Sequence, residues 1–236
     1  MRYMGSKAKY TKHIIPHILA NHKEGKPYVE PFCGGGNMLS EIPLPNKWGN
    51  DTAKYAVALL DAIGNKGYKP PEIVSEEDYQ KVKENPENYN PAYVGFLAYC
   101  CSYAGKFWGG FWRAVDSKGN PRNGAKEQVN NLLKQSKGLS SVKFTTLSYL
   151  DLSIQSGSTV YCDPPYAGTT GYKGEFNHDK FWSWCSSLVD SGCNVLVSEY
   201  TAPPNWLPVW EKEVTNSLTK DTGSKRGVEK LFMRYK

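Results

Sequence analysis

The stretch KPYVEPFCGGGN, residues 26–37, predicts the opening of a parallel α/β sheet. Residues 26–31 have the apolar pattern of a short buried strand that breaks at proline, and three consecutive glycines follow. Glycines in such a turn permit positive φ angles and let a ligand approach the backbone. Residues 37–41 then predict a short helix. Taken alone, a glycine turn between a strand and a helix is more often structural than functional.

A second strand and a second helix follow this turn. KWGND predicts a strand that ends at Asp51, and residues 52–63 have the apolar spacing of a helix. This order of elements is typical of a doubly wound, Rossmann-like α/β sheet. Further strands are predicted over 142–150, 158–163 and 193–200, with a helix over 178–192 and a C-terminal hairpin formed by WEKEVTNS and EKLFMRY.

The middle of the chain has a different composition. Residues 63–140 are rich in Asn, Pro, Lys and Tyr and predict an inserted, mainly helical region between two catalytic parts, 1–62 and 141–236. From Cys101 to Lys143, eight lysines and arginines stand against two acids, so this segment alone carries an excess equal to the chain's formal net charge of +6. A confined basic patch favours a polyanionic partner, and a plain solvated surface is the equally weighted alternative.

The composition argues against a membrane span, an export signal and a metal site. The 236 residues contain no stretch near the ~20 apolar residues that a membrane span needs, and the first residues lack an apolar signal core. The six cysteines form no Cys-x-x-Cys pair, and the four histidines lack finger spacing, so we expect no metal site. We therefore expect reduced thiols in a cytoplasmic protein without a membrane partner.

The stretch YCDPPYAG, residues 161–168, places an acid, two prolines and a ring at a predicted strand end. The Asp163 carboxylate and the Pro164 carbonyl are two acceptors suited to an amine with two N–H donors. Tyr166 offers a face on which a nucleobase can stack. Because ligands bind at strand ends in α/β sheets, we favour function over the alternative of a proline turn capped by aspartate.

Asp51 is the candidate partner of a ribose. An acid at the end of the second strand is placed to accept hydrogen bonds from ribose hydroxyls, as an adenosine-bearing ligand requires. The glycine spacing matches neither G-x-G-x-x-G nor a phosphate-binding loop.

D-P-P-Y at 163–166, together with V-E-P-F-x-G-G-G at 29–36, resembles the Dam-type (D12 class, alpha group) S-adenosylmethionine-dependent DNA adenine-N6 methyltransferases. RYMGSK, GND, FNHDKF, VLVSEY and RGVEKLF resemble other segments of that family. The resemblance implies a set of cofactor-binding residues: Tyr3, Lys7, Glu30, Pro31, Phe32, Gly34, Gly36, Asp51, Ser148 and Asp163. Two positions depart from the family: Ser6 replaces a glycine, and Ser148 or Asp151 stands where an acid usually contacts the cofactor adenine.

The resemblance also implies that the insertion recognises DNA. Its segment CSYAGKFWGGFWR interleaves aromatic rings with basic residues, although we expect at least half of these rings to form a small core. The predicted DNA-binding residues are Lys106, Trp108, Arg113, Arg122, Lys126, Lys225 and Arg226.

The activity implied is methyl transfer from S-adenosylmethionine to N6 of a flipped-out adenine in double-stranded DNA. Asp163, Pro164 and Tyr166 are the predicted catalytic residues, no metal takes part, and the enzyme is expected to be a monomer or weak dimer. Cytosine N4, adenine in RNA, and a DNA-binding module without activity are the alternatives. The recognition sequence and the role in restriction, phage or host marking stay open.

Overall fold

The computed structural model describes residues 1–166, 176–215 and 226–235, with only the backbone of 214–215 and 226–227. Two compact units divide the chain. Unit 1 comprises Met1–Thr11 and Cys33–Tyr149, and unit 2 comprises Lys12–Phe32 and Leu150–Lys236. The break at Phe32 falls inside the glycine-rich stretch, so each unit holds part of that motif.

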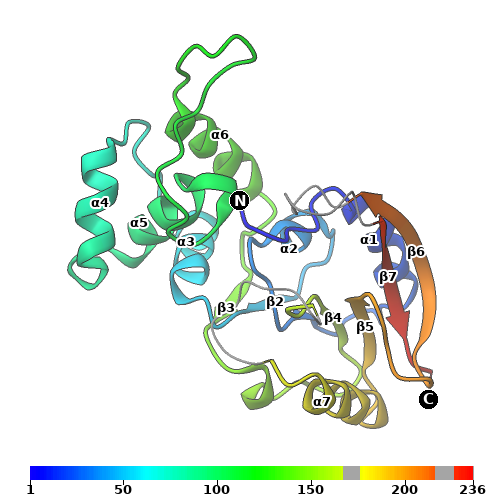
Figure 1. Ribbon diagram of the computed structural model, residues 1–236. Helices are drawn as coiled ribbons and strands as arrows, with labels where there is room; N and C mark the ends of the chain where they lie inside the picture. Colours follow the sequence, from blue (N-terminus) through cyan, green and yellow to red (C-terminus); the bar gives the residue numbers. More distant parts are fainter. Residues whose placement is uncertain (167–175, 216–225, 236) are drawn as a thin grey trace. The chain divides into compact units, whose positions relative to one another are not determined.

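The strands of unit 2 run in the order β1-β4-β5-β7-β6. The first three, β1 (Tyr28–Glu30), β4 (Thr159–Cys162) and β5 (Asn194–Glu199), are parallel. Every residue of β1 and β4 is buried, as parallel strands covered on both faces require. The predicted C-terminal hairpin is confirmed as β6 (Leu207–Thr215) and β7 (Arg226–Met233), which form an antiparallel pair (Figure 1).

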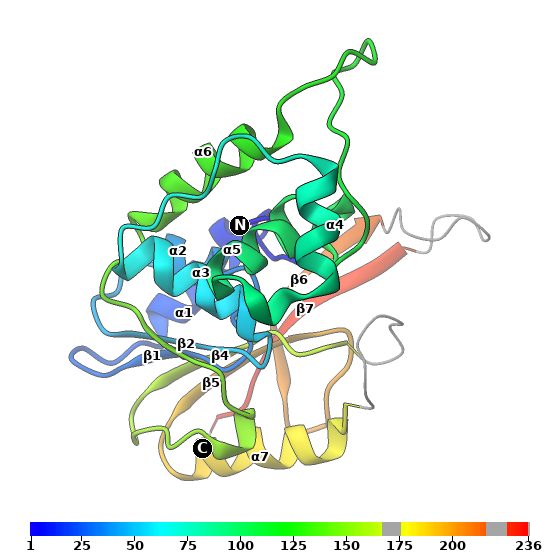
Figure 2. The ribbon, with the colours of Figure 1, turned by 90° about the vertical axis from the view of Figure 1, so that its left-hand side faces the viewer.

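Two helices cover the parallel strands of unit 2. Figure 2 shows α1 (Thr11–Ala20) and α7 (His178–Asp190) on opposite sides of these strands. In α7, the Asn177 side chain caps the first turn by accepting the Lys180 N–H at 2.8 Å. The predicted helix over 178–192 is therefore confirmed, and the α/β fold class with it.

Unit 1 contains the parallel pair β2 (Lys47–Asn50) and β3 (Lys143–Thr145) and most of the helices. The predicted helices after the glycine turn and after Asp51 are confirmed as α2 (Asn37–Glu41) and α3 (Lys54–Asn65). The central region is mainly helical, as predicted: it contains α4 (Glu76–Glu84), α5 (Pro91–Gly95), a π-helical turn over Phe96–Cys100, and α6 (Gly124–Ser136).

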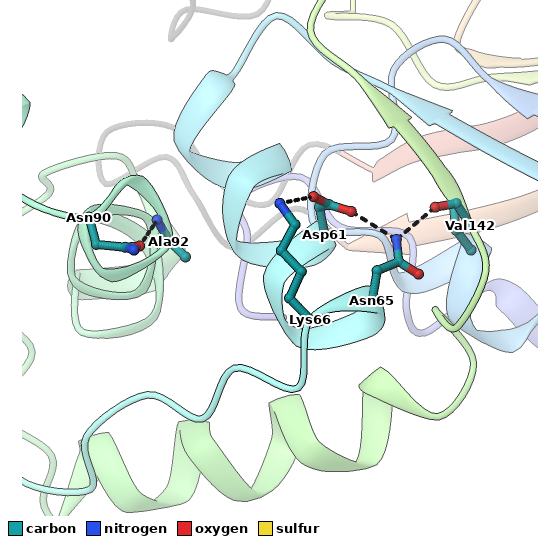
Figure 3. A network of polar contacts seen from close by, with 6 residues as sticks. All are labelled: Asp61, Asn65, Lys66, Asn90, Ala92 and Val142. Atoms are coloured by element: carbon teal, nitrogen blue, oxygen red, sulfur yellow. Dashed lines mark hydrogen bonds and ion pairs between the residues drawn. The ribbon is translucent and has the colours of Figure 1, made fainter.

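The end of α3 is fastened to the start of β3 by side chains (Figure 3). The Asn65 amide donates to the Val142 carbonyl at 2.9 Å and to the Asp61 carboxylate at 2.8 Å. Lys66 pairs with the same carboxylate at 2.7 Å. These contacts set where β3 begins. Elsewhere in Figure 3, the Asn90 side chain caps α5 by accepting the Ala92 N–H at 2.9 Å.

The prediction of one strand over 142–150 was wrong in length. β3 ends at Thr145. Beyond it, the N–H and C=O groups of Leu147 form hydrogen bonds with the Asn50 side chain and not with the backbone of a neighbouring strand. A 3-10 turn follows at Tyr149–Asp151. Local side-chain hydrogen bonds of this kind compete with strand pairing, and apolar spacing does not reveal them.

Candidate active site

The glycine turn in unit 1 needs glycine for its backbone shape. Gly34 and Gly36 have φ angles of 49° and 64°, in the left-handed region that other residues rarely adopt. The turn also lies against the N-terminal segment, since a Cβ on Gly35 would come within 2.7 Å of the Tyr3 Cβ. Tyr3, a predicted cofactor-binding residue, therefore packs against the glycine turn, which is also predicted to bind the cofactor.

The segment that carries Tyr3 and Lys7 is held along unit 1. The Tyr3 ring stacks on Tyr99 with 5.1 Å between ring centroids, and the Met4 N–H donates to the Gly105 carbonyl at 3.1 Å. Lys7 is half-buried, and its carbonyl accepts the Tyr10 N–H at 2.7 Å. Ser6, which replaces a family glycine, uses its hydroxyl to accept from the Asn37 amide at 2.7 Å.

Asp51 is the acidic group beside the glycine turn. One carboxylate oxygen accepts the Gly34 N–H at 2.8 Å, and the other accepts the Ala53 N–H at 2.9 Å. A carboxylate offers about four lone-pair positions, so these two bonds leave acceptor capacity for a pair of hydroxyls. Burial raises the pKa of Asp51 above 3.8, opposed by the hydrogen bonds from the backbone of Ala53 and Gly34.

Asn50, one residue earlier, is a site residue that the sequence did not single out. Its side chain is fully buried. Its amide donates to the Leu147 carbonyl at 2.9 Å, and its oxygen accepts the Leu147 N–H at 2.9 Å and the Thr145 hydroxyl at 2.8 Å. Asn50 therefore fixes the backbone that leads directly to Ser148. The asparagine of the GND motif was the signal available in the sequence.

Ser148 follows this pinned backbone, where it is half-buried. Asp151, the alternative for the same contact, lies exposed in the 3-10 turn Tyr149–Asp151. Because Asn50 fixes the backbone at Leu147, the position of Ser148 is set within unit 1. This favours Ser148 over Asp151 for the contact with the cofactor adenine.

The D-P-P-Y loop of unit 2 begins directly after β4. Asp163 is half-buried and Pro164 is buried, and no residue that the structure describes donates a hydrogen bond to the Pro164 carbonyl. The hydroxyl of Tyr166 donates to the Glu229 carboxylate. Burial, followed by the charges of Asp163 and Glu229, raises the pKa of Tyr166 well above its usual value. Tyr166 is therefore a neutral phenol and a hydrogen-bond donor.

Aromatic contacts in unit 2 link two of the predicted motifs. Phe32 meets Phe176 and Phe181 edge-on, with centroid separations of 5.9 and 5.7 Å. The FNHDKF segment thus supports the Phe32 end of the glycine-rich stretch. Next to it, Pro31 follows β1, whose last residue Glu30 is buried and accepts the Tyr28 hydroxyl at 2.7 Å.

Most of the predicted DNA-binding side chains are exposed in unit 1, and three of them are ion-paired. Arg113 contacts both oxygens of the Glu76 carboxylate at 2.6 and 2.7 Å. Arg122 pairs with Glu127 at 2.6 Å, and Lys126 with Glu72 at 3.6 Å. Exposed pairs of this kind are worth little and exchange readily for other anions. They leave the cations accessible to a phosphate.

The segment between Arg113 and Arg122 is a projecting hairpin, visible before α6 in Figure 2. Its ends are joined by the bridge between Val115 and Pro121. The Asp116 carboxylate orders its tip by accepting from the backbone of Lys118 and Asn120 at 2.8 and 2.9 Å.

Of the other predicted DNA contacts, Lys106 is exposed, whereas Trp108 meets the fully buried Tyr79 edge-on at 5.1 Å. Trp108 thus belongs to the small aromatic core expected of this region, while Tyr103 and Phe107 remain 68% and 46% exposed. Lys225 lies outside the described residues, and Arg226 begins β7, where only the backbone is described.

No helix among the described residues is long and apolar enough to cross a membrane. Nor do the described ranges contain a group of three or more His, Cys, Asp or Glu side chains that could hold a metal ion.

Comparison with known proteins gives one family match. The model of the D12 class N6 adenine-specific DNA methyltransferases matches residues 3–226. Among solved structures, a crystal structure of SMU.472 complexed with SAH is similar with a TM-score of 0.39 and 11% sequence identity. The alignment covers 97% of this chain and 52% of that one, so this chain spans about half the length of SMU.472. A similarity at this level supports no inference about fold or activity.

Proposed function

The chain belongs to the D12 class N6 adenine-specific DNA methyltransferase family, and from this premise we propose that it methylates adenine N6 in double-stranded DNA. The family predicted from D-P-P-Y and the glycine-rich stretch is thereby confirmed. The cofactor of such an enzyme is S-adenosylmethionine. The observation that carries the proposal is the D-P-P-Y loop, with a half-buried Asp163 beside a Pro164 carbonyl to which no described residue donates.

Unit 1 offers residues that fit the adenosine part of the cofactor. Asp51 has acceptor capacity for the two ribose hydroxyls, because each of its oxygens takes one backbone N–H. The positive-φ glycines contribute no side chains of their own to the turn, and the Tyr3 side chain packs against it. Ser148 is the proposed contact of the cofactor adenine, on a backbone fixed by Asn50.

Other family positions complete the proposed cofactor site. Lys7, Glu30, Pro31 and Phe32 are assigned to it by the motif match, and Phe32 gains support from its contacts with Phe176 and Phe181. When bound, S-adenosylmethionine supplies an electrophilic methyl group.

The acceptors of unit 2 fit the amine that receives this group. The N6 lone pair of adenine is delocalised into the ring, which makes the nitrogen a poor nucleophile. Acceptance of its two N–H bonds by the Asp163 carboxylate and the Pro164 carbonyl draws the nitrogen toward a tetrahedral geometry and releases the lone pair. The Asp163 charge also stabilises the positive charge that develops on the nitrogen. Holding the amine at this point is the positioning contribution.

Tyr166 is proposed to receive the target base. The N6 atom lies inside the duplex, so the adenine has to be flipped out at a cost of a few kcal/mol. Stacking on an aromatic ring returns ~1–3 kcal/mol per base. We assign the rest of the DNA contact to the insertion, residues 63–140, where Lys106, Arg113, Arg122 and Lys126 are exposed.

A nucleoside assay tests the proposed function. DNA is incubated with the purified protein and methyl-labelled S-adenosylmethionine, digested, and its nucleosides are separated by mass spectrometry. We expect the label in N6-methyladenine. Label in N4-methylcytosine supports the cytosine alternative instead. No label, combined with DNA binding and no calorimetric signal for the cofactor, supports the alternative of a binding module.

A further inference from the structure

Glu229 is a buried acid that the proposed mechanism does not use. It lies in β7 of unit 2, and its side chain is 4% exposed. Its carboxylate accepts the hydroxyl of Tyr166, the ring of the D-P-P-Y loop. Burying a carboxylate is costly unless it is hydrogen-bonded, so a strand position such as this favours an apolar residue when only packing matters.

The Tyr166 ring is held from two directions within unit 2. The hydrogen bond to Glu229 fixes its hydroxyl, and bonds between a neutral donor and a carboxylate are stronger and more directional than neutral ones. Tyr200, just past the end of β5, lies nearly perpendicular to the ring, with 4.7 Å between centroids and an interplanar angle of 83°. The two contacts together restrict rotation of the ring about its side-chain bonds.

A fixed ring matters for a base that is flipped out of the duplex. Stacking needs a ring plane that is already oriented, because any freedom lost on binding is subtracted from the affinity. Asp163 is three residues before Tyr166 in the same loop, and its charge is one of the causes that raise the pKa of Tyr166. The ring that Glu229 holds is therefore within electrostatic reach of the proposed amine acceptor.

We infer that Glu229 is a positioning residue, which orients the Tyr166 ring through its hydroxyl so that the ring can stack on the flipped adenine. This inference rests on the proposed function. It assigns to the RGVEKLF segment a role in base capture that is separate from cofactor binding. A purely structural Glu229 would instead stabilise the sheet without any dependence on the Tyr166 hydroxyl.

Four variants separate the two roles: Glu229→Gln, Glu229→Leu, Tyr166→Phe, and the double change Glu229→Leu with Tyr166→Phe. Glutamine keeps an acceptor, whereas leucine removes it, and phenylalanine keeps the ring without its hydroxyl. Glu213→Leu, at an exposed position of β6, is the control for replacing an acid by leucine in the same hairpin. The readouts are KM for DNA, kcat, and the fluorescence of 2-aminopurine at the methylated position.

We expect Glu229→Leu and Tyr166→Phe each to raise the KM for DNA about tenfold and to lower the 2-aminopurine signal, since each removes a charge-assisted hydrogen bond. Glu229→Gln should stay within about threefold of the wild type, and the double variant should be no worse than Tyr166→Phe. The cofactor affinity should not change in any of them. Multiplying effects in the double variant, or a fall in cofactor affinity, would overturn the inference.

A second measurement does not depend on methylation. In urea unfolding, Glu229→Leu should change the unfolding equilibrium constant of the wild type and that of Tyr166→Phe by different factors, because the two side chains are coupled. Equal factors would show that the contact carries no energy and would also overturn the inference. If the wild-type protein does not methylate DNA, the proposed function is wrong. The unfolding measurements on the four variants still decide whether Glu229 holds Tyr166.

Discussion

At the scale of single residues, Asp51 is a half-buried acid with a proposed role in binding the cofactor, and this combination predicts a dependence on pH. Burial raises the pKa of its carboxyl above 3.8, so the folded chain takes up this proton at a higher pH than the unfolded chain does. The stability that this group contributes is thus present at acid pH and is lost as the pH rises through the raised pKa. The ionised form is the better acceptor for ribose hydroxyls.

The affinity for S-adenosylmethionine should therefore fall on acidification, starting above the pH at which an ordinary aspartate titrates. Calorimetry between neutral pH and about pH 5 measures this dependence. Asp51→Asn should bind the cofactor about 10- to 100-fold more weakly, since a hydrogen bond to a charged group is lost, and should show a flatter pH profile. An affinity of the wild type that does not vary with pH contradicts the assignment.

A sequence motif was enough to propose some of the site residues. Others became visible only through their contacts in the structure. Asp51, Asp163 and the glycines stand in recognisable patterns, and their roles in the site remain predictions. Asn50 lies one residue before Asp51, but its partner Leu147 is 97 residues away. Glu229 and its partner Tyr166 are 63 residues apart. A side chain that acts through a distant backbone or ring leaves no spacing signal.

At the scale of elements, Asn50 links β2 to the chain that leaves β3. Asn50→Ala removes three hydrogen bonds at a buried side chain and should destabilise the fold by about 1–3 kcal/mol. Because it also releases the backbone before Ser148, it should weaken cofactor binding. Urea unfolding and calorimetry measure the two effects.

Asn65→Ala is the control, because Asn65 makes similar bonds to the backbone at the other end of β3 (Figure 3). It should lower the stability and leave the cofactor affinity unchanged. Equal losses of cofactor affinity in both variants would contradict a specific role for Asn50.

The helices and strands were predicted correctly from the sequence where the apolar periodicity was strong. The helices α3 and α7 and the parallel strands of unit 2 were predictable because their apolar residues recur at helical spacing or form short buried runs. The helix α1 was not predicted, since Pro16 interrupts its pattern, yet Ile14 and Ile18 are both fully buried. There, burial of one apolar face outweighs the lost backbone hydrogen bond.

At the scale of the whole molecule, three exposed cations of the basic segment, Arg113, Arg122 and Lys126, are paired with acids. Arg113→Ala should weaken DNA binding and reduce the slope of log affinity against log salt by about 1, if this cation neutralises a phosphate. Glu76→Gln should strengthen binding about two- to threefold, because it releases Arg113 from a surface pair worth ~0–1 kcal/mol. Fluorescence anisotropy at several salt concentrations measures both.

Lys83→Ala, an exposed lysine at the end of α4, is the control for charge loss and should leave the salt slope nearly unchanged. An unchanged slope in Arg113→Ala would place the DNA contact elsewhere.

The six cysteines report on the intactness of the fold. All are buried and none is in a disulfide among the described residues, and burial raises the pKa of Cys100 to about 11. Since the thiolate is the reactive form, the native protein should react slowly with a disulfide reagent near neutral pH. All six should react rapidly in urea. Rapid reaction of the native protein would contradict the burial of these side chains.

The central claim is that Asp163 activates an adenine amine, and single-turnover methyl transfer tests it most directly. Wild type, Asp163→Ala and the control Asp190→Ala, an exposed acid at the end of α7, are mixed with DNA and labelled S-adenosylmethionine. We expect N6-methyladenine from wild type and Asp190→Ala at equal rates. Asp163→Ala should lose at least about 10³-fold in rate while DNA binding is largely kept. Turnover by Asp163→Ala near the wild-type rate would contradict the mechanism.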